Sequence, residues 1–351
     1  MNFRDLILHA VPAIVLASVA HAADDAALDA EPLSYVRACD VWGAGFYYIP
    51  GTETCVKAGG HIRYDIAAGK VPTYGLAVPG TYHSRSELAL NWDARTETEL
   101  GTLRSFAQVT FAFDNALQRA TGSPNSASLP FGYMTLGSTT STGLQFRLGV
   151  NDTLFRTAAG LTALHIYAGG FTHAPTTTGQ MVVSYGKGNF SGALGLETGA
   201  GRQSIDSYMP HVVAAAAYSD SWGALRSAVV YNSVLEEWAA KLKLELNATD
   251  DLSLYAMGVY SSDPSGRNFY TPFIGNYGVW VGSTYQFTPK VKGLLQFAAD
   301  GMGADVDDRF SVLAGLQYEP VSKLYIKPEI AYLDKGSDSE VAGIVRFQTN
   351  F

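Results

Sequence analysis

The amino-acid sequence predicts an all-β fold, a sixteen-stranded antiparallel transmembrane β-barrel. Three features predict it. Apolar and polar residues alternate with a period of two in many segments, the N-terminus has the pattern of an export signal, and no later apolar run reaches the length of about 18 residues that a membrane-spanning helix needs. Because only helices and closed barrels satisfy their backbone hydrogen bonds in lipid, a barrel remains as the membrane-spanning option.

The composition agrees with many half-exposed strands. The 351 residues include 20 Tyr, 17 Phe and 36 Gly, and only 16% of them are charged. Aromatic residues favour strands, whereas amphipathic helices need more charge than this. The net charge of −8 is spread along the chain, so we expect no nucleic-acid partner.

Residues 1–22 are predicted to be a signal peptide. Arg4 precedes an apolar stretch from Leu6 to Val19, and Ala20-His21-Ala22 offers small residues at the two positions that signal peptidase reads. We expect cleavage after Ala22 and export of the chain. A cytoplasmic N-terminal helix is the alternative.

The segment 23–59 contains both cysteines of the chain, Cys39 and Cys55. In an oxidising compartment we expect them to form a disulfide, which would stabilise the fold by about 3 kcal/mol through closure of the loop between them. Two free thiols are the alternative. No Cys-x-x-Cys pair or nearby Cys/His set offers four ligands, so we expect no metal site, and no cofactor motif is present.

Residues 60–351 are predicted to form the barrel. The alternation is clearest at Glu87–Arg95, Trp238–Asn247 and Lys323–Tyr332, where one face is apolar and the other carries charged residues or amides. The same criterion predicts strands near residues 60–68, 86–97, 103–114, 129–137, 143–150, 180–187, 190–198, 210–218, 223–232, 237–247, 251–261, 275–287, 290–299, 309–318, 322–332 and 340–351.

The predicted connections alternate between short turns and longer loops. A transmembrane barrel shows this rhythm because one rim faces the periplasm and the other faces the exterior. The connection at Ser233–Glu236 is the exception, since it is short where a long loop is expected. It leaves open whether the strand count is wrong or that loop is truncated.

The two faces of each strand are expected to meet different solvents. In a membrane the apolar face contacts lipid and the polar face lines the lumen, which is water-filled in a barrel of about sixteen strands. The strand residues predicted to line the pore include Arg63, Arg95, Arg104, Arg147, Lys241, Lys243 and Glu245. The alternative for these residues is the solvated outer face of a soluble sheet. Seven aromatic residues are candidates for interfacial girdles or for ordinary strand positions: Tyr64, Trp92, Tyr255, Tyr277, Trp280, Tyr318 and Tyr332.

Several segments resemble the alphaproteobacterial general porin family, the outer-membrane porins of the rhizobial and brucella type. They are YVRACDVWGAGFYYIPGTETC at Tyr35–Cys55, ETELGTL at Glu97–Leu103, SYMPHVV at Ser207–Val213, EEWA at Glu236–Ala239 and the C-terminal GIVRFQTNF. The resemblance implies a sixteen-stranded trimeric barrel with an inward-folded third loop, here about Asn151–Gly179. It also supports the disulfide between Cys39 and Cys55.

The function that this resemblance implies is a water-filled channel for passive diffusion of small hydrophilic solutes and ions across the outer membrane, without enzymatic activity. The expected partners are membrane lipid, lipopolysaccharide and two further copies in a homotrimer. A substrate-specific outer-membrane channel is the alternative, and an outer-membrane hydrolase or a soluble secreted binding protein are more distant rivals. No G-x-S-x-G or H-E-x-x-H motif is present.

The predicted inward loop departs from the family in its charge. After Asp152 it contains no acidic residue, and it carries Arg156, His165 and His173. We add Asp152 and Arg156 to the predicted pore lining, and we expect a weaker preference for cations than in relatives whose loop is rich in acids.

Overall fold

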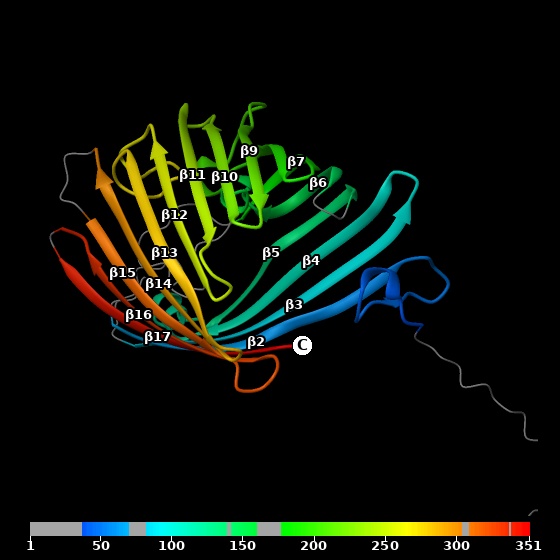
Figure 1. Ribbon diagram of the computed structural model, residues 1–351, viewed down its shortest axis with the longest axis horizontal. Coiled ribbons are helices and arrows are strands. Elements are labelled where there is room, and N and C mark those ends of the chain that lie inside the picture. Colours follow the sequence, from blue (N-terminus) through cyan, green and yellow to red (C-terminus); the bar gives the residue numbers. More distant parts are fainter. Residues whose placement is uncertain (1–36, 70–81, 139–141, 160–176, 304–308, 337) are drawn as a thin grey trace, which may run out of the picture. The chain divides into compact units, whose positions relative to one another are not determined.

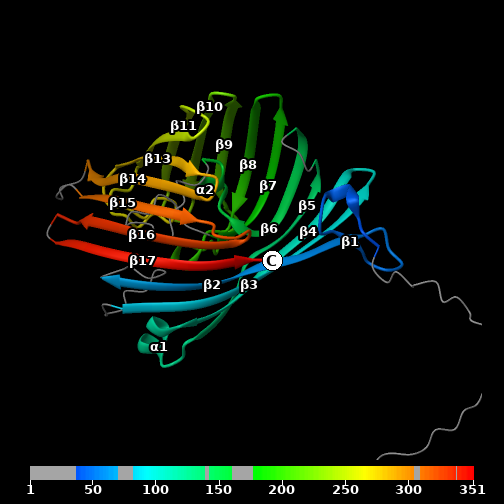
Figure 2. The same cartoon turned by 60° about the horizontal axis from the view of Figure 1, so that its bottom comes forward.

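A computed structural model describes residues 37–69, 82–138, 142–159, 177–303, 309–336 and 338–351. In this part of the chain, sixteen strands, β2 to β17, each pair antiparallel with the next, and β17 pairs with β2 to close the ring (Figures 1 and 2). A two-residue strand, β1 (Tyr47–Tyr48), pairs with the first two residues of β2. The predicted sixteen-stranded antiparallel barrel is therefore confirmed.

The strands are β2 (Cys55–Gly69), β3 (Tyr82–Thr98), β4 (Gly101–Asp114), β5 (Asn125–Gly137), β6 (Gly143–Asp152), β7 (Thr177–Lys187), β8 (Phe190–Glu197), β9 (His211–Asp220), β10 (Gly223–Asn232), β11 (Glu237–Asn247), β12 (Leu252–Ser261), β13 (Tyr277–Thr288), β14 (Val291–Met302), β15 (Arg309–Tyr318), β16 (Leu324–Asp334) and β17 (Ser339–Asn350). The helices are η1 (Asp40–Trp42), α1 (Asn115–Thr121), α2 (Leu154–Thr157) and η2 (Gly201–Gln203). No helix among the described residues is long and apolar enough to cross a membrane.

Each predicted strand range overlaps one observed strand, and the differences lie at the ends. The first barrel strand begins at Cys55 rather than near residue 60, because the disulfide-bonded segment continues directly into β2. The short Ser233–Glu236 connection is real and the strand count stands, so that loop is truncated. Its turn is closed by Glu236 in a left-handed conformation, with φ of 59°.

The strand faces divide as the alternation predicts. On β11, Lys241 and Lys243 are 3% and 2% exposed, whereas Leu242 between them is 54% exposed. The exposed apolar side chains of the other strands continue this outer surface, which suits contact with lipid. The charged side chains therefore face the interior of the ring.

Two of the aromatic residues considered for interfacial girdles lie inside the barrel instead. Trp280 is 1% exposed and packs edge-to-face against Phe273, and the Tyr255 hydroxyl donates a hydrogen bond to Gln296. The girdle interpretation is wrong for these two residues. Tyr255 is on β12 and Trp280 is on β13, and both of these strands are apolar on both faces. The other five are exposed on the outer face: Tyr64, Trp92, Tyr277, Tyr318 and Tyr332.

Candidate functional site

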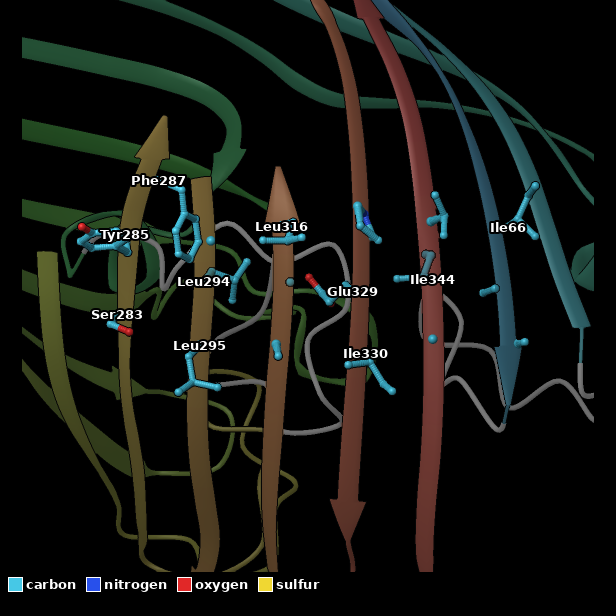
Figure 3. A pocket seen from close by; sticks show the side chains of 18 residues that line it. Ile66, Ser283, Tyr285, Phe287, Leu294, Leu295, Leu316, Glu329, Ile330 and Ile344 are labelled. Carbon is cyan, nitrogen blue, oxygen red and sulfur yellow. The ribbon is translucent and has the colours of Figure 1, made fainter. Parts of the chain in front are cut away.

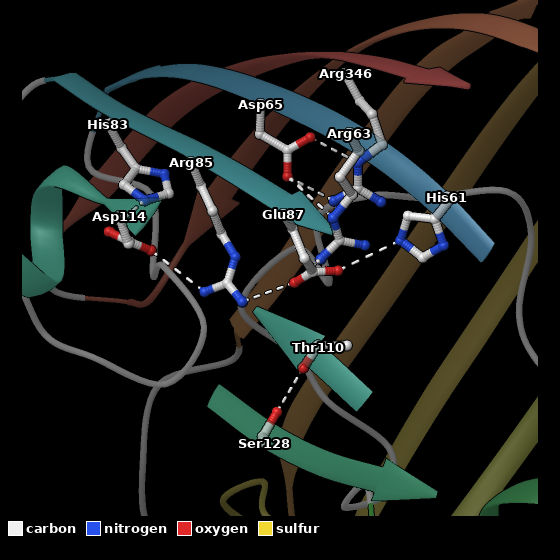
Figure 4. Close-up of polar contacts among 10 residues, drawn as sticks. All are labelled: His61, Arg63, Asp65, His83, Arg85, Glu87, Thr110, Asp114, Ser128 and Arg346. Carbon is white, nitrogen blue, oxygen red and sulfur yellow. Dashed lines mark hydrogen bonds and ion pairs between the residues drawn. The ribbon is translucent and has the colours of Figure 1, made fainter. Parts of the chain in front are cut away.

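One side of the barrel interior is a network of arginines and carboxylates on β2, β3 and β17 (Figure 4). Arg346 donates two hydrogen bonds of 2.7 Å to Asp65 across the pair of strands that closes the ring. Arg63 and Arg85 both donate to Glu87, at 3.0 and 2.7 Å. Since charges on neighbouring inward positions are compensated pairwise, this wall is polar with little net charge.

The network continues to the loop after β4. Arg85 also donates to Asp114, whose carboxylate lies 3.0 Å from His83 Nε2 (Figure 4). The same carboxylate accepts hydrogen bonds from the backbone amides of Ala116 and Leu117 and so caps the N-terminus of α1. One acidic residue at the end of a strand therefore starts a helix and fixes an interior arginine.

A second cluster of charges lies toward the short-turn ends of β3 and β4. Asp93 accepts hydrogen bonds from both Arg95 and Arg104, at distances of 2.8 to 3.1 Å. The Arg95 guanidinium also lies over the rings of Phe46 and Trp42, at 4.8 and 5.5 Å from their centroids. Arg95 is therefore covered by the N-terminal segment, and its hydrogen bonds are separate from the network that contains Arg63 and Glu87.

The predicted disulfide between Cys39 and Cys55 is confirmed, with an S–S distance of 1.94 Å. Both cysteines are buried together with Phe46, and Trp42 and Tyr48 pack against them. This small core holds residues 37–54 onto the start of β2.

The opposite side of the interior is apolar. Buried side chains of the inner face of β7 and β9 to β14 form one cluster with residues of α2 and of the β12–β13 connection. Its members include Leu154, Phe155, Val182, Val213, Val230, Met257, Val259, Tyr270, Phe273 and Trp280. Figure 2 shows α2 within the ring of strands. Two segments between strands therefore enter the barrel and pack on the same wall.

These segments are joined by what we call the lumenal cluster, made of Leu154, Phe155, Glu197, Lys241 and Tyr270. Glu197, at the end of β8, accepts a hydrogen bond of 2.6 Å from the Leu154 amide and one of 2.9 Å from the Tyr270 hydroxyl. The Phe155 ring packs edge-to-face against Tyr270, and Lys241 Nζ lies 3.9 Å from the centre of the Phe155 ring. All five side chains are buried.

The absence of a side chain at Gly195 and the protonated hydroxyl of Tyr270 both favour the contacts of the lumenal cluster. A Cβ atom at Gly195 would lie 3.1 Å from Leu154 and 3.3 Å from Val182, so the absence of a side chain lets α2 approach the wall. Burial, together with the Glu197 carboxylate, raises the pKa of Tyr270 above the ordinary tyrosine value. The hydroxyl therefore remains a hydrogen-bond donor.

The β12–β13 connection is held at further points. Asn232 at the end of β10 donates to Gln203 and Asn268, and Gln203 accepts a hydrogen bond of 2.8 Å from the Phe269 amide. Thr271 donates to Ser261 at 2.8 Å. These hydrogen bonds therefore hold the β12–β13 connection in a fixed position inside the barrel.

The remaining predicted lining residues lie on or near this second wall. Glu245 pairs with Lys243 at 2.6 Å and with Arg226 at 2.9 Å. Asp152 has its ion-pair partner on its own segment, Arg156 at 3.7 Å. Arg147 donates to the neutral side chain of Gln180 at 3.1 Å. Among the described residues, Asp152 thus has its ion pair within its own segment and not with an arginine of the strands.

Sequence reasoning missed Glu197, Tyr270 and Gln203. Glu197 and Tyr270 are 73 positions apart, and neither has a local pattern that distinguishes it from an ordinary rim residue. The signal that was available is the length and aromatic content of the connection after Ser261, which is unlike a simple turn. The histidines His165 and His173, most of the proposed inward loop and the signal peptide with its cleavage after Ala22 lie outside the described residues.

An apolar concavity lies on the outer surface of the barrel. It crosses β13 to β17 and β2, and its lining includes the exposed side chains of Ile66, Tyr285, Leu295, Leu316 and Ile330 (Figure 3). A groove of this kind on the outer wall fits lipid rather than hydrophilic solutes. Within the described ranges, no group of three or more His, Cys, Asp or Glu side chains is placed to hold a metal ion.

Comparison with known proteins identifies the family. A family model described as "Porin subfamily" matches residues 25–350. Porin Omp2a of Brucella suis biovar 1 (strain 1330) is 35% identical over 380 residues, and porin Omp2b of Brucella abortus (strain 2308) is 34% identical over 375, each alignment covering 100% of both chains. The outer membrane channel DcaP of Acinetobacter baumannii matches the fold with a TM-score of 0.64 at 15% identity, covering 86% of this chain and 99% of that one.

These findings agree with the interior described above, which has charged pairs on one wall. Porins are channel proteins of the outer membrane, not enzymes. The chain therefore belongs to the Porin subfamily and forms an outer-membrane channel for passive diffusion.

Proposed function

We propose that small hydrophilic solutes and ions cross this channel along the charged wall of β2 to β4 and β17, facing α2 and the β12–β13 connection. The observation that carries the proposal is the contrast between interior ion pairs such as Arg346–Asp65 and the apolar outer surface. Water must fill the space between the walls to hydrate these charges. The proposed lining is Arg63, Arg95, Arg104, Arg147, Asp152, Arg156, Lys241, Lys243 and Glu245.

We further propose that the segment Asn151–Gly179 narrows the channel. The described start of this segment supports the proposal, because α2 is fixed to the inner wall through Leu154, Phe155 and Glu197. A segment anchored in this way sets the size limit for solutes.

The charge of the lining predicts a weaker preference for cations than in porins whose inward loop is rich in acids. Arg147 and Lys327 have no ion pair among the described residues, whereas Asp65, Glu87, Asp93 and Glu245 are each paired with arginine or lysine. We expect a reversal potential close to zero, or anion-preferring, when purified protein in a planar bilayer separates unequal KCl concentrations. Strong cation preference would refute this part of the proposal.

The same recording tests the function as a whole. We expect stepwise, long-lived increases in conductance that are linear in voltage, as for a permanently water-filled pore. A substrate-specific channel is the second candidate, and it would show saturation of the current by one solute class and competition from that class alone.

We propose a homotrimer, because porins generally form trimers, and crosslinking in detergent that yields only monomers would count against it. Of the small-residue stretch Val212–Ala217, Val213 is buried inside the barrel and is therefore not available to such an interface. We propose that mature chains begin at Ala23, which N-terminal sequencing of protein from outer membranes tests.

A further inference from the structure

A cavity of about 250 Å³ lies inside the barrel between α2 and the inner wall of β6 to β10. Its polar lining consists of Gln145, Arg147, Thr157, Ser184, Ser191 and Arg226. The back of the cavity is made of glycine and alanine, Gly192, Ala193 and Ala215 among them, so that small side chains leave the space open. The lining thus has two guanidinium groups and several hydroxyls, and it has no carboxylate among its described members.

Arg147 is the decisive residue of this cavity. Its Nη2 donates to the Gln180 side chain at 3.1 Å, and its Nε is buried without a hydrogen-bond partner among the described residues. No carboxylate of the described chain lies within ion-pair distance of it. A guanidinium withdrawn from water without a carboxylate in contact is costly, so the cavity favours a bound anion.

The surroundings do not remove this excess of positive charge. Arg226, on the opposite side of the lining, shares its carboxylate partner Glu245 with Lys243. The sequence from Ala158 to Gly179, which follows α2, contains no acidic residue. Arg226 and Lys243 thus both pair with Glu245, while Glu197, whose charge acts on Arg147, lies beyond ion-pair distance and already accepts hydrogen bonds from Leu154 and Tyr270.

We propose that this cavity is a binding site for a small oxyanion, a carboxylate or phosphate group of a passing solute. The planar guanidinium of Arg147 suits two parallel hydrogen bonds to such a group, and Ser184 and Ser191 supply hydroxyl donors around it. The site lies behind α2, beside the path proposed above, so it would hold anionic solutes at the constriction before they pass. This inference rests on the proposed diffusion function and adds a solute class to it.

Inorganic phosphate is the probe that tests the site. Single channels in a planar bilayer are recorded in KCl while phosphate is added at constant ionic strength, and the current is measured against phosphate concentration. We expect a saturable decrease in wild-type current. Arg147→Gln is expected to raise the half-blocking concentration about tenfold or more, the loss expected for a charge-assisted pair of hydrogen bonds.

Arg119→Gln is the matched control, because it removes the same charge from an exposed guanidinium on α1, which donates to the Tyr82 carbonyl and is not part of the proposed lining. It is expected to leave the half-blocking concentration near the wild-type value. An unchanged value in Arg147→Gln, or an equal increase in both variants, overturns the proposal, since only the total charge of the protein would then matter.

Arg147→Lys keeps the experiment decisive if Arg147→Gln does not assemble. It retains the charge and loses the planar fork, so a several-fold weaker block is expected, and an unchanged block contradicts the site. Wild-type channels that conduct but show no saturable effect of phosphate overturn this inference alone. The absence of any conductance would instead contradict the proposed function.

Discussion

Arg346 on the last strand and Asp65 on the first are joined by two hydrogen bonds of 2.7 Å, from Nε to Oδ1 and from Nη2 to Oδ2. They face each other in the register of β17 and β2, where the two ends of the sheet meet, although 281 positions separate them in the chain. Asp65 is buried and also lies 3.8 Å from Arg63. The closure of the ring and its charged lining are therefore stabilised by the same side chains.

Asp65→Asn is expected to destabilise the closed barrel. The substitution removes a buried carboxylate from Arg346 and Arg63, and loss of one partner of a buried pair costs about 3–5 kcal/mol. Urea unfolding in detergent, followed by the change in gel mobility of the folded barrel, measures the difference. Asp220→Asn in an exposed turn serves as control, and equal shifts for both variants would show that the seam pair contributes nothing special.

Tyr270→Phe is expected to loosen α2 from the wall while the barrel still assembles. The variant removes the hydrogen bond to Glu197 and keeps the ring contact with Phe155, so its cost is about 1–3 kcal/mol, concentrated in the lumenal cluster. Single-channel recordings are expected to show more frequent current fluctuations than wild type. Tyr185→Phe removes a hydroxyl from the exposed outer face and is expected to behave as wild type. Identical traces for all three proteins would refute the role of Tyr270.

The strands could be predicted from the sequence because apolar residues that face lipid alternate with polar residues that face water along each strand. At Trp238–Asn247 the apolar and charged positions alternate without a break, and the observed β11 has the predicted bounds. The same rule fails for Tyr255 and Trp280. Where a wall is apolar on both faces, alternation no longer says which side points to lipid, and these two aromatic residues lie inside.

The site was harder to predict because it depends on contacts between distant segments. The sequence indicated the inward charges of Arg63, Arg104 and Lys243 one strand at a time. It did not indicate which carboxylate each would meet, nor that the β12–β13 connection would place Tyr270 against Glu197. Local periodicity contains no information on such pairings, since they are set by the register and closure of the whole ring.

Leu242→Arg tests the orientation of the strands. Leu242 is exposed at the middle of β11 between two inward lysines, and an arginine facing lipid near the bilayer centre costs about 2–4 kcal/mol. Leu246→Arg, on the same face at the short-turn end of the strand, is expected to cost about 0–1 kcal/mol. Equilibrium unfolding of both variants in lipid vesicles measures the costs. A cost that does not depend on position along the strand would contradict a lipid-facing surface.

Removal of the disulfide is expected to affect stability more than transport. The paired change of Cys39→Ser and Cys55→Ser lowers the free energy of unfolding by about 3 kcal/mol, because the unfolded chain gains the freedom that the closed loop denied it. The charged wall at Arg346 and Glu87 keeps its contacts, so the main conductance is expected to stay close to the wild-type value. A large loss of conductance in correctly assembled protein would assign the N-terminal segment a direct part in the pore.

Swelling of proteoliposomes in solutions of uncharged sugars tests the diffusion channel most directly. If the lumen is an open aqueous path limited only by its width, the swelling rate will rise in proportion to sugar concentration and fall steeply as the sugars become larger. A passive diffusion channel would be contradicted by swelling rates that saturate with one sugar while other sugars of equal size cause no swelling, or by vesicles that do not swell in any sugar.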